Sequence, residues 1–182
     1  ILAGVALSAL FSSATVLLQY LASETQLAVV VFWTFGDVAR SNWAEIGFMT
    51  AAAACATLFF TIHRWDLNAL SSGEETARGL GVRVQRIRFA GMVAAALVTA
   101  FATAFHGVIA FVGLIAPHIA RRIVGADHGL LIPFSSLLGA LLLLGADTAG
   151  RVLVGSGSLP VGVITSFMGA PMFLYLLIRG YR

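Results

Sequence analysis

Long apolar stretches alternate with short polar segments along the whole chain. A bilayer core needs about 20 apolar residues per spanning helix, and six stretches approach that length. The stretch near Pro117 is short, so we expect it to be tilted, broken or only partly spanning. The Gly/Ser/Pro segment 155–160 is too irregular to face lipid and is expected at an interface or against protein. The pattern predicts an all-α polytopic membrane bundle of six transmembrane helices, at residues 2–21, 44–62, 87–106, 109–122, 131–150 and 164–179.

The arginines are unevenly divided between the polar segments that join these spans. If the start of the first span is cytoplasmic, only Arg40 and Arg151 face outward. The cytoplasmic arginines are then Arg64, Arg78, Arg83, Arg86, Arg88, Arg121, Arg122, Arg179 and Arg182. Loops rich in arginine stay in the cytoplasm. The sequence therefore predicts a multi-pass protein of the cell membrane with both ends of this chain in the cytoplasm.

Composition narrows the functional classes. The chain is 59% hydrophobic and 10% charged, with a formal net charge of +3, whereas ordinary soluble domains carry about 25% charged residues. This excludes a soluble globule, a nucleic-acid binder and a disordered chain. The sequence contains no lysine, which excludes a Walker A phosphate loop and a Schiff base in this chain. We therefore expect a non-enzymatic subunit without a cofactor, in which the single Cys55 is a small packing residue.

Small and hydroxylated residues recur every four positions within two of the predicted spans. Such ridges let helix backbones approach closely in a membrane. The longer ridge consists of Gly91, Ala95, Thr99, Thr103 and Gly107, and the first span carries Gly4, Ser8 and Ser12. Helix packing is the main interpretation. The alternative is that Ser8, Ser12 and Gln19 line a solvated path.

The polar loop 66–86 predicts a turn, a short helix and a second turn. Ser71 or Ser72 is a candidate N-cap, and Glu74 and Glu75 would lie in the first turn, where the helix dipole favours negative charge. These features indicate a defined helix in the loop.

The sequence also predicts where this short helix ends and what its surface is like. Gly79 and Gly81 are expected to terminate it. Its apolar residues, Ala77 and Leu80, are too few to insert strongly into lipid. A short capped helix flanked by charges suits a groove on a partner protein, and the alternative is a merely solvated loop.

Several ordered motifs resemble those of the FecCD/BtuC permease family, the membrane subunits of type II ABC importers for iron–siderophores, haem and vitamin B12. The resemblance covers essentially the whole chain. The motifs begin with Ile-Leu-Ala-Gly-Val-Ala-Leu at 1–7, the spaced Trp33, Gly36 and Trp43, Leu-Asn-Ala-Leu at 67–70, and Gly-Glu-Glu-Thr-Ala-Arg-Gly-Leu-Gly-Val at 73–82. They continue with Phe-Val-Gly-Leu-Ile-Ala-Pro-His-Ile-Ala-Arg at 111–121, Ala-Asp-His at 126–128, Gly-Ala-Asp at 145–147, Leu-Pro-Val-Gly-Val-Ile-Thr at 159–165 and Gly-Ala-Pro at 169–171.

The resemblance implies a ten-span permease that works as a homodimer or pseudodimer. It implies two ATPase subunits below it and an extracytoplasmic substrate-binding protein above it. This chain resembles spans five to ten, and its start at Ile1 inside an apolar helix agrees with a fragment of a permease domain covering residues 1–182. Its first span would be the pathway-lining fifth. The loop 66–86 would be the coupling loop, with ATPase-coupling residues Leu70, Gly73, Glu74, Glu75, Ala77, Arg78, Gly79, Leu80 and Gly81.

Arg151 is the candidate for docking the binding protein. The resemblance places it where family members offer an arginine to acidic groups, and arginine–carboxylate pairs are strong and directional. The alternative is that Asp147, one turn earlier, neutralises it. The sequence departs from the family at Ser158, where a glutamate is usual before Leu-Pro.

A metal site and two other functions are the remaining alternatives. His118 and His128 lie ten residues apart without a Cys/His cluster, so we expect helix packing and loop hydrogen bonding instead of a metal site. An ion-gradient-driven secondary transporter would need carboxylates along a membrane path, for which Asp147 is the sole clear candidate, with Glu45 at an interface. A scaffold subunit without transport is the third hypothesis.

Overall fold

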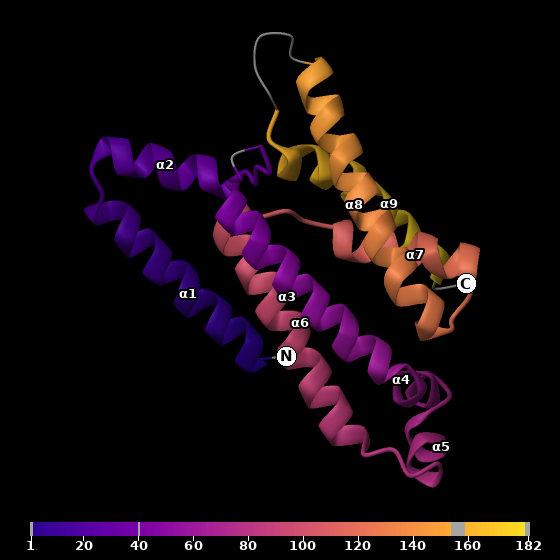
Figure 1. Cartoon of the computed structure of the whole chain (residues 1–182). Coiled ribbons are helices and arrows are strands. Elements are labelled where there is room, and N and C mark those ends of the chain that lie inside the picture. Colours follow the sequence, from indigo (N-terminus) through magenta and orange to yellow (C-terminus); the bar gives the residue numbers. More distant parts are fainter. Residues whose placement is uncertain (1, 40, 154–158, 181–182) are drawn as a thin grey trace.

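The computed structural model describes residues 2–39, 41–153 and 159–180, and every regular element within them is a helix (Figure 1). The helices are α1 (Leu2–Leu21), α2 (Glu24–Thr34), α3 (Trp43–Ile62), α4 (Arg64–Ser71), α5 (Glu74–Gly79), α6 (Val84–His106), α7 (Val112–Val124), α8 (His128–Leu153) and α9 (Val161–Gly180). The all-α prediction is confirmed.

Four of the described helices are long and apolar enough to cross a membrane, namely α1, α3, α6 and α8. They confirm four predicted spans. The expectation that the stretch near Pro117 is short agrees with α7, which has 13 residues, or about 20 Å of helix, less than the thickness of a bilayer core. In α9 the apolar segment identified is Val161–Tyr175. The six-span count thus stays a prediction.

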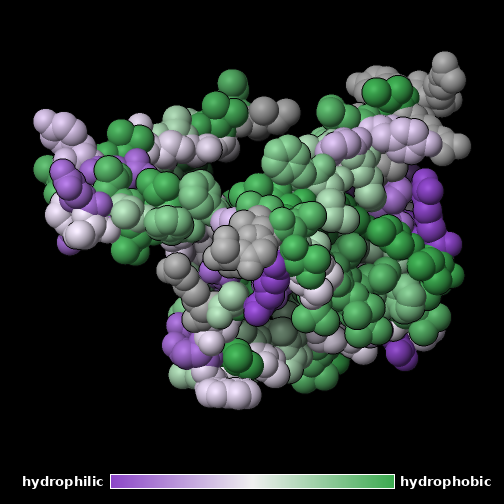
Figure 2. Space-filling view, turned by 90° about the horizontal axis from the view of Figure 1, so that it is seen from above, coloured by the Kyte–Doolittle hydropathy of each residue, from purple (hydrophilic) through white to green (hydrophobic). Residues whose placement is uncertain are grey.

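Two helix groups make up the packed part of the bundle. Figure 1 shows α3 beside α6 and α7 beside α8 and α9, while α1 and α2 extend to one side. The α7–α8 contact is the most extensive and buries Ile115, Ala116, Ala120 and Leu131. Figure 2 shows broad hydrophobic areas on the outward surface, as expected where lipid or partner helices replace water.

The predicted small-residue ridge on α6 is used only at its ends. A methyl group added at Gly91 would lie 3.5 Å from the Phe60 ring on α3, and Gly107 is buried. Ala95 and Thr99, in the middle of the ridge, are exposed. On α1, open space surrounds Gly4.

The helix α2 was not predicted from the sequence. It begins with a capping box in which Ser23 Oγ accepts from the Gln26 N–H at 3.4 Å and the Gln26 side chain accepts from the Ser23 N–H at 3.0 Å. The same device starts α3, where Asn42 and Glu45 exchange hydrogen bonds. Since both boxes satisfy backbone donors that would otherwise lack partners, they fix where the chain leaves the polar segment.

Three chain segments meet at the end of the bundle where α2 ends and α9 begins. The Asp37 N–H donates to the His106 carbonyl at 2.8 Å, and the Gly162 N–H donates to the Gly36 carbonyl at 3.2 Å. The Trp33 indole donates to the Ala104 carbonyl at 3.2 Å. We call residues 33–37, 104–108 and 159–162 the glycine junction.

Glycines allow these segments to approach each other. Gly36 and Gly107 have φ of +68° and +75°, in the left-handed region that suits glycine. A Cβ at Gly107 would overlap the Trp33 carbonyl oxygen, and a Cβ at Gly162 would overlap two carbonyl oxygens. The junction is therefore held by direct backbone packing.

Candidate functional site

The polar loop after α3 contains two short helices, where the sequence predicted one. His63 ends α3 and starts α4, with φ −90° and ψ 14°, and α5 follows after Gly73. The predicted N-cap of α5 is wrong. Ser71 donates its hydroxyl to the Leu67 carbonyl at 3.1 Å, and Ser72 is the C-cap of α4. Both serines belong to α4, and Gly73, with φ +112°, makes the reversal into α5 that a side chain would hinder.

The predicted glycine stop of α5 is confirmed at Gly81. Its φ is +84°, its N–H donates to the Arg78 carbonyl at 3.0 Å, and the Val82 N–H donates to the Ala77 carbonyl at 3.0 Å. This is the pair of bonds of a Schellman motif. Gly79 is the last helical residue. The motif fixes the path of the chain from α5 into α6.

The surface of α5 separates its two apolar side chains. Ala77 is 0% exposed and packs inward, whereas Leu80 is 70% exposed. Glu75 and Arg78 are also exposed, and Leu70 on α4 is half-buried. The loop thus presents one large apolar side chain between charged groups.

Glu74 links α5 to α6. Its carboxylate accepts from Arg78 at 3.4 Å and also pairs with Arg88 on α6. The three side chains are 44–62% exposed, so solvent screens the pairs and each contributes little free energy. Only the pair with Arg88 joins α5 to α6.

Asn68 links α4 to the turn between α7 and α8. Its Nδ2 donates to Asp127 Oδ1 at 2.6 Å. Its Oδ1 accepts from the His128 backbone N–H at 2.9 Å and lies 2.7 Å from His128 Nδ1. We call Asn68, Asp127 and His128 the asparagine junction. The predicted loop hydrogen bonding of His128 is confirmed.

The electrostatics of this junction favour a charged Asp127. The hydrogen bond from Asn68 lowers the pKa of the Asp127 carboxyl from its ordinary value of 3.8, assisted by the Gly129 N–H and the positive charge of Arg64. Sequence reasoning noted both motifs, at 67–70 and 126–128, and did not bring them together.

Arg151 and Asp147 form an ion pair near the far end of α8. Arg151 Nε and Nη2 lie 2.9 and 2.8 Å from Asp147 Oδ2. The Arg151 side chain is 58% exposed and that of Asp147 is 14% exposed. The neutralising role proposed for Asp147 is confirmed, and Arg151 still has a solvent-facing edge. Ser158 and the predicted irregular segment up to it lie outside the described residues.

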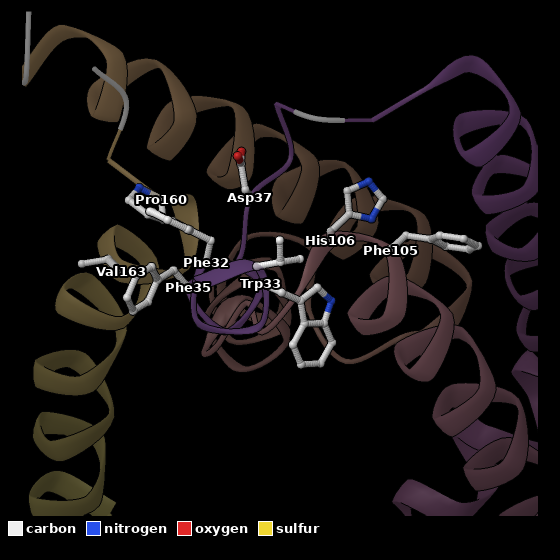
Figure 3. A pocket seen from close by; sticks show the side chains of 9 residues that line it. Phe32, Trp33, Phe35, Asp37, Phe105, His106, Pro160 and Val163 are labelled. Carbon is white, nitrogen blue, oxygen red and sulfur yellow. The ribbon is translucent and has the colours of Figure 1, made fainter. Parts of the chain in front are cut away.

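An aromatic pocket of about 400 Å³ adjoins the glycine junction. Figure 3 shows Asp37 and His106 on its rim, with Phe32, Trp33 and Phe35 nearby. His106 Nε2 lies 2.8 Å from Ser41 Oγ. This pocket was not predicted from the sequence, because it depends on α2.

The remaining candidates lie on other helices. Ser8 and Ser12 are exposed on α1 and Gln19 is half-buried. His118 is on α7, with its Nε2 buried and without a hydrogen-bond partner in the described part of the chain. No group of three or more His, Cys, Asp or Glu residues gathers at a potential metal site within the described ranges.

Comparisons with known proteins agree with the motifs. A model of the FecCD transport family matches residues 1–179. A Methanocaldococcus jannaschii protein named as an ABC transporter permease is 53% identical over 182 residues, 100% of this chain and 52% of that protein. The hemin transport system permease protein HmuU of Yersinia pestis is 36% identical over 179 residues, 98% of this chain and 54% of that protein.

A solved structure is also similar. It is described as an inward-facing conformation of a metal-chelate type ABC transporter, and it matches with a TM-score of 0.89 and 36% identity over 98% of this chain and 58% of that chain. The chain therefore spans about half the length of the curated relatives it matches.

Proposed function

Because the chain belongs to the FecCD transport family, we propose that it forms the C-terminal half of an ABC importer permease that moves a metal chelate across the cell membrane. The names of two similar proteins, for hemin and for metal chelates, support a substrate of the iron–siderophore, haem or cobalamin type. In this role the chain performs no bond chemistry. Its partners are ATPase subunits that hydrolyse ATP, an extracytoplasmic binding protein and a second permease subunit.

The observation that carries this proposal is the surface of the loop 66–86. Ala77 is the buried residue of α5, and the Schellman motif fixes the end of this helix. Glu75, Arg78 and Leu80 are exposed on its outer side. An exposed apolar side chain flanked by charged side chains, on a helix whose end is fixed, suits a groove on a folded partner. We propose that this loop is the coupling loop and that the ATPase subunit binds it.

Charge distribution supports the orientation. Arg64 and Arg78 belong to the end of the bundle that carries α4 and α5, while Arg151 lies 23 residues beyond His128 on α8, about 35 Å along the helix. Under the positive-inside rule the α4–α5 end is cytoplasmic. We propose that both ends of this chain are then cytoplasmic and that α1 lines the path with Ser8, Ser12 and Gln19.

Arg151 is proposed to dock the binding protein. Its Nε and Nη2 face Asp147, which leaves Nη1 and one edge of the guanidinium for a carboxylate of the partner. Arg151→Glu should weaken binding-protein affinity roughly tenfold or more, whereas Asp147→Asn should change it far less. Equal affinity of Arg151→Glu and the unmodified complex would leave only the internal ion pair.

The ion-gradient alternative has less support. Its two candidate carboxylates are engaged, Asp147 with Arg151 and Glu45 in the capping box of α3. A proton or ion relay needs carboxylates that can release these partners.

Transport assays on the full-length complex test the coupling loop. Glu75→Lys and Leu80→Asp should lower transport roughly tenfold or more by weakening the ATPase contact, while ATP hydrolysis continues. Glu75 is the cleaner choice, because Glu74 already pairs with Arg78 and Arg88. Glu24→Lys, at the start of α2, is the matched control. Wild-type transport by both loop variants in assembled complexes would contradict the proposal.

A further inference from the structure

Two polar side-chain links between the loop 66–86 and the bundle differ in chemistry. On α5, Glu74 pairs with Arg88 of α6. On α4, Asn68 bonds to Asp127 and His128 at the turn that starts α8. Together with the packing of α4 and α5 against the bundle, these links connect the loop to α6 and to α8.

The link through Asn68 is the more specific of the two. All polar atoms of its side-chain amide are in use, with Nδ2 on Asp127 and Oδ1 on His128. Two of its contacts are with the Asp127 carboxylate and the His128 backbone N–H, which lie at the start of α8. The Glu74–Arg88 pair, in contrast, joins two long and exposed side chains, which can follow each other over a range of geometries.

The asparagine junction lies at the start of the long helix α8. α8 is one helix from His128 to Leu153 and carries the Asp147–Arg151 pair near its other end. A shift of α4 that moves Asp127 and His128 therefore moves the start of a helix that reaches the opposite side of the bundle.

We propose that Asn68 is a positioning residue of the transport cycle, which makes α4 and the start of α8 move as one unit and so passes movement of the coupling loop to α8. This inference rests on the proposed function, because it requires that the ATPase acts on the loop. The exposed surface of the loop would bind the ATPase, whereas Asn68, Asp127 and His128 would transmit the movement from the loop to α8.

Donor and acceptor roles give a sharp test. Asn68→Asp replaces the amide nitrogen, which lies 2.6 Å from Asp127 Oδ1, with a carboxylate oxygen. Two negative charges would then face each other at that distance and repel. Asp127→Asn keeps an acceptor for Asn68 and should be mild. The double variant Asn68→Asp/Asp127→Asn restores a donor at 127 facing an acceptor at 68, while residue 68 still accepts from the His128 N–H.

The measurement is the number of ATP molecules hydrolysed per substrate transported by the full-length permease, reconstituted with its ATPase and binding protein. Asn68→Asp should raise this ratio roughly tenfold, equivalent to about 1.4 kcal/mol. Asp127→Asn and the double variant should stay within about threefold of the unmodified complex. Ser71→Ala is the matched control, because it removes a hydrogen bond confined to α4 and should leave the ratio unchanged.

The outcomes separate the inference from the proposed function. An unchanged ratio in Asn68→Asp, or a double variant as uncoupled as Asn68→Asp, overturns the role of the junction if Glu75→Lys still uncouples. If Glu75→Lys leaves transport intact as well, the loop is not the coupling element and the proposed function fails with it. Should Asn68→Asp not assemble, Asn68→Ala removes the same contacts without adding charge and is judged by the same ratio.

Discussion

The glycine junction and the asparagine junction both tie distant segments of the chain together, but they use opposite means. At the glycine junction, backbone meets backbone because Gly36, Gly107 and Gly162 have no side chains. At the asparagine junction, the Asn68 side chain bonds to the Asp127 side chain and to the backbone N–H and imidazole of His128. The first contact tolerates almost no displacement, whereas the second holds α4 and the start of α8 together by hydrogen bonds whose geometry can adjust.

This difference divides the bundle into a fixed part and an adjustable part. Close-packed backbone has few alternative arrangements and transmits strain. Hydrogen-bonded side chains accept a range of geometries while the bonds stay intact. The fixed junction holds α2, α6 and α9 around the aromatic pocket, and the adjustable junction lies where the ATPase is proposed to act. The proposed transport function would use both kinds of contact.

The largest effect is expected from filling the glycine junction. Gly107→Ala would overlap the Trp33 carbonyl and require φ +75° of an alanine, so it should lower the free energy of unfolding by roughly 3 kcal/mol or more. Thermal unfolding of the full-length permease in detergent measures this. Gly4→Ala is the control, since open space surrounds Gly4. Equal melting temperatures for the two variants would show that the junction is adjustable after all.

A smaller effect, which depends on pH, is expected at the asparagine junction. The pKa of Asp127 is below 3.8 in the folded chain, so its charged form stabilises the fold above that pH, and this contribution is lost as the pH falls through the lower folded value. The melting-temperature difference between the unmodified protein and Asp127→Asn should thus vanish on acidification. In an Asn68→Ala background the pH dependence should shrink. A difference that is constant down to pH 3 would contradict the assigned contacts.

The smallest effect is expected from the exposed pair between α5 and α6. Arg88→Gln should change the free energy of unfolding by about 0.5 kcal/mol or less, and the change should fall further as salt is raised to about 1 M. Urea unfolding at two salt concentrations measures it, with Arg83→Gln as the control on the same segment. A salt-independent loss of several times this size would place the pair among the fixed contacts.

The long helices could be predicted from the sequence because each one needs only its own residues. α1, α3, α6 and α8 each contain about 20 apolar residues, and the count alone identifies them. The stop of α5 at Gly81 was also a local property. α2 was missed, although its capping box at Ser23 and Gln26 is written in the sequence.

The contacts that join distant segments could not be predicted in the same way. Nothing in residues 67–70 specifies that Asn68 meets Asp127, 59 positions later, because that meeting depends on how α3 and α8 pack. The serine cap of α5 was wrong for a related reason, since α4 uses both serines before α5 begins. Local signals compete, and the tertiary arrangement decides between them.

The short length of α7 has a consequence for how the protein is made. A helix of 13 residues spans about 20 Å and cannot leave the translocon for a bilayer core of about 30 Å by itself. Its ends would expose backbone polar groups to lipid. We expect α7 to stay at the translocon until α8 has been synthesised, and the two helices then to enter the membrane together as a hairpin. The order of synthesis along the chain, with the short helix before its long partner, then determines when this helix pair can enter the membrane.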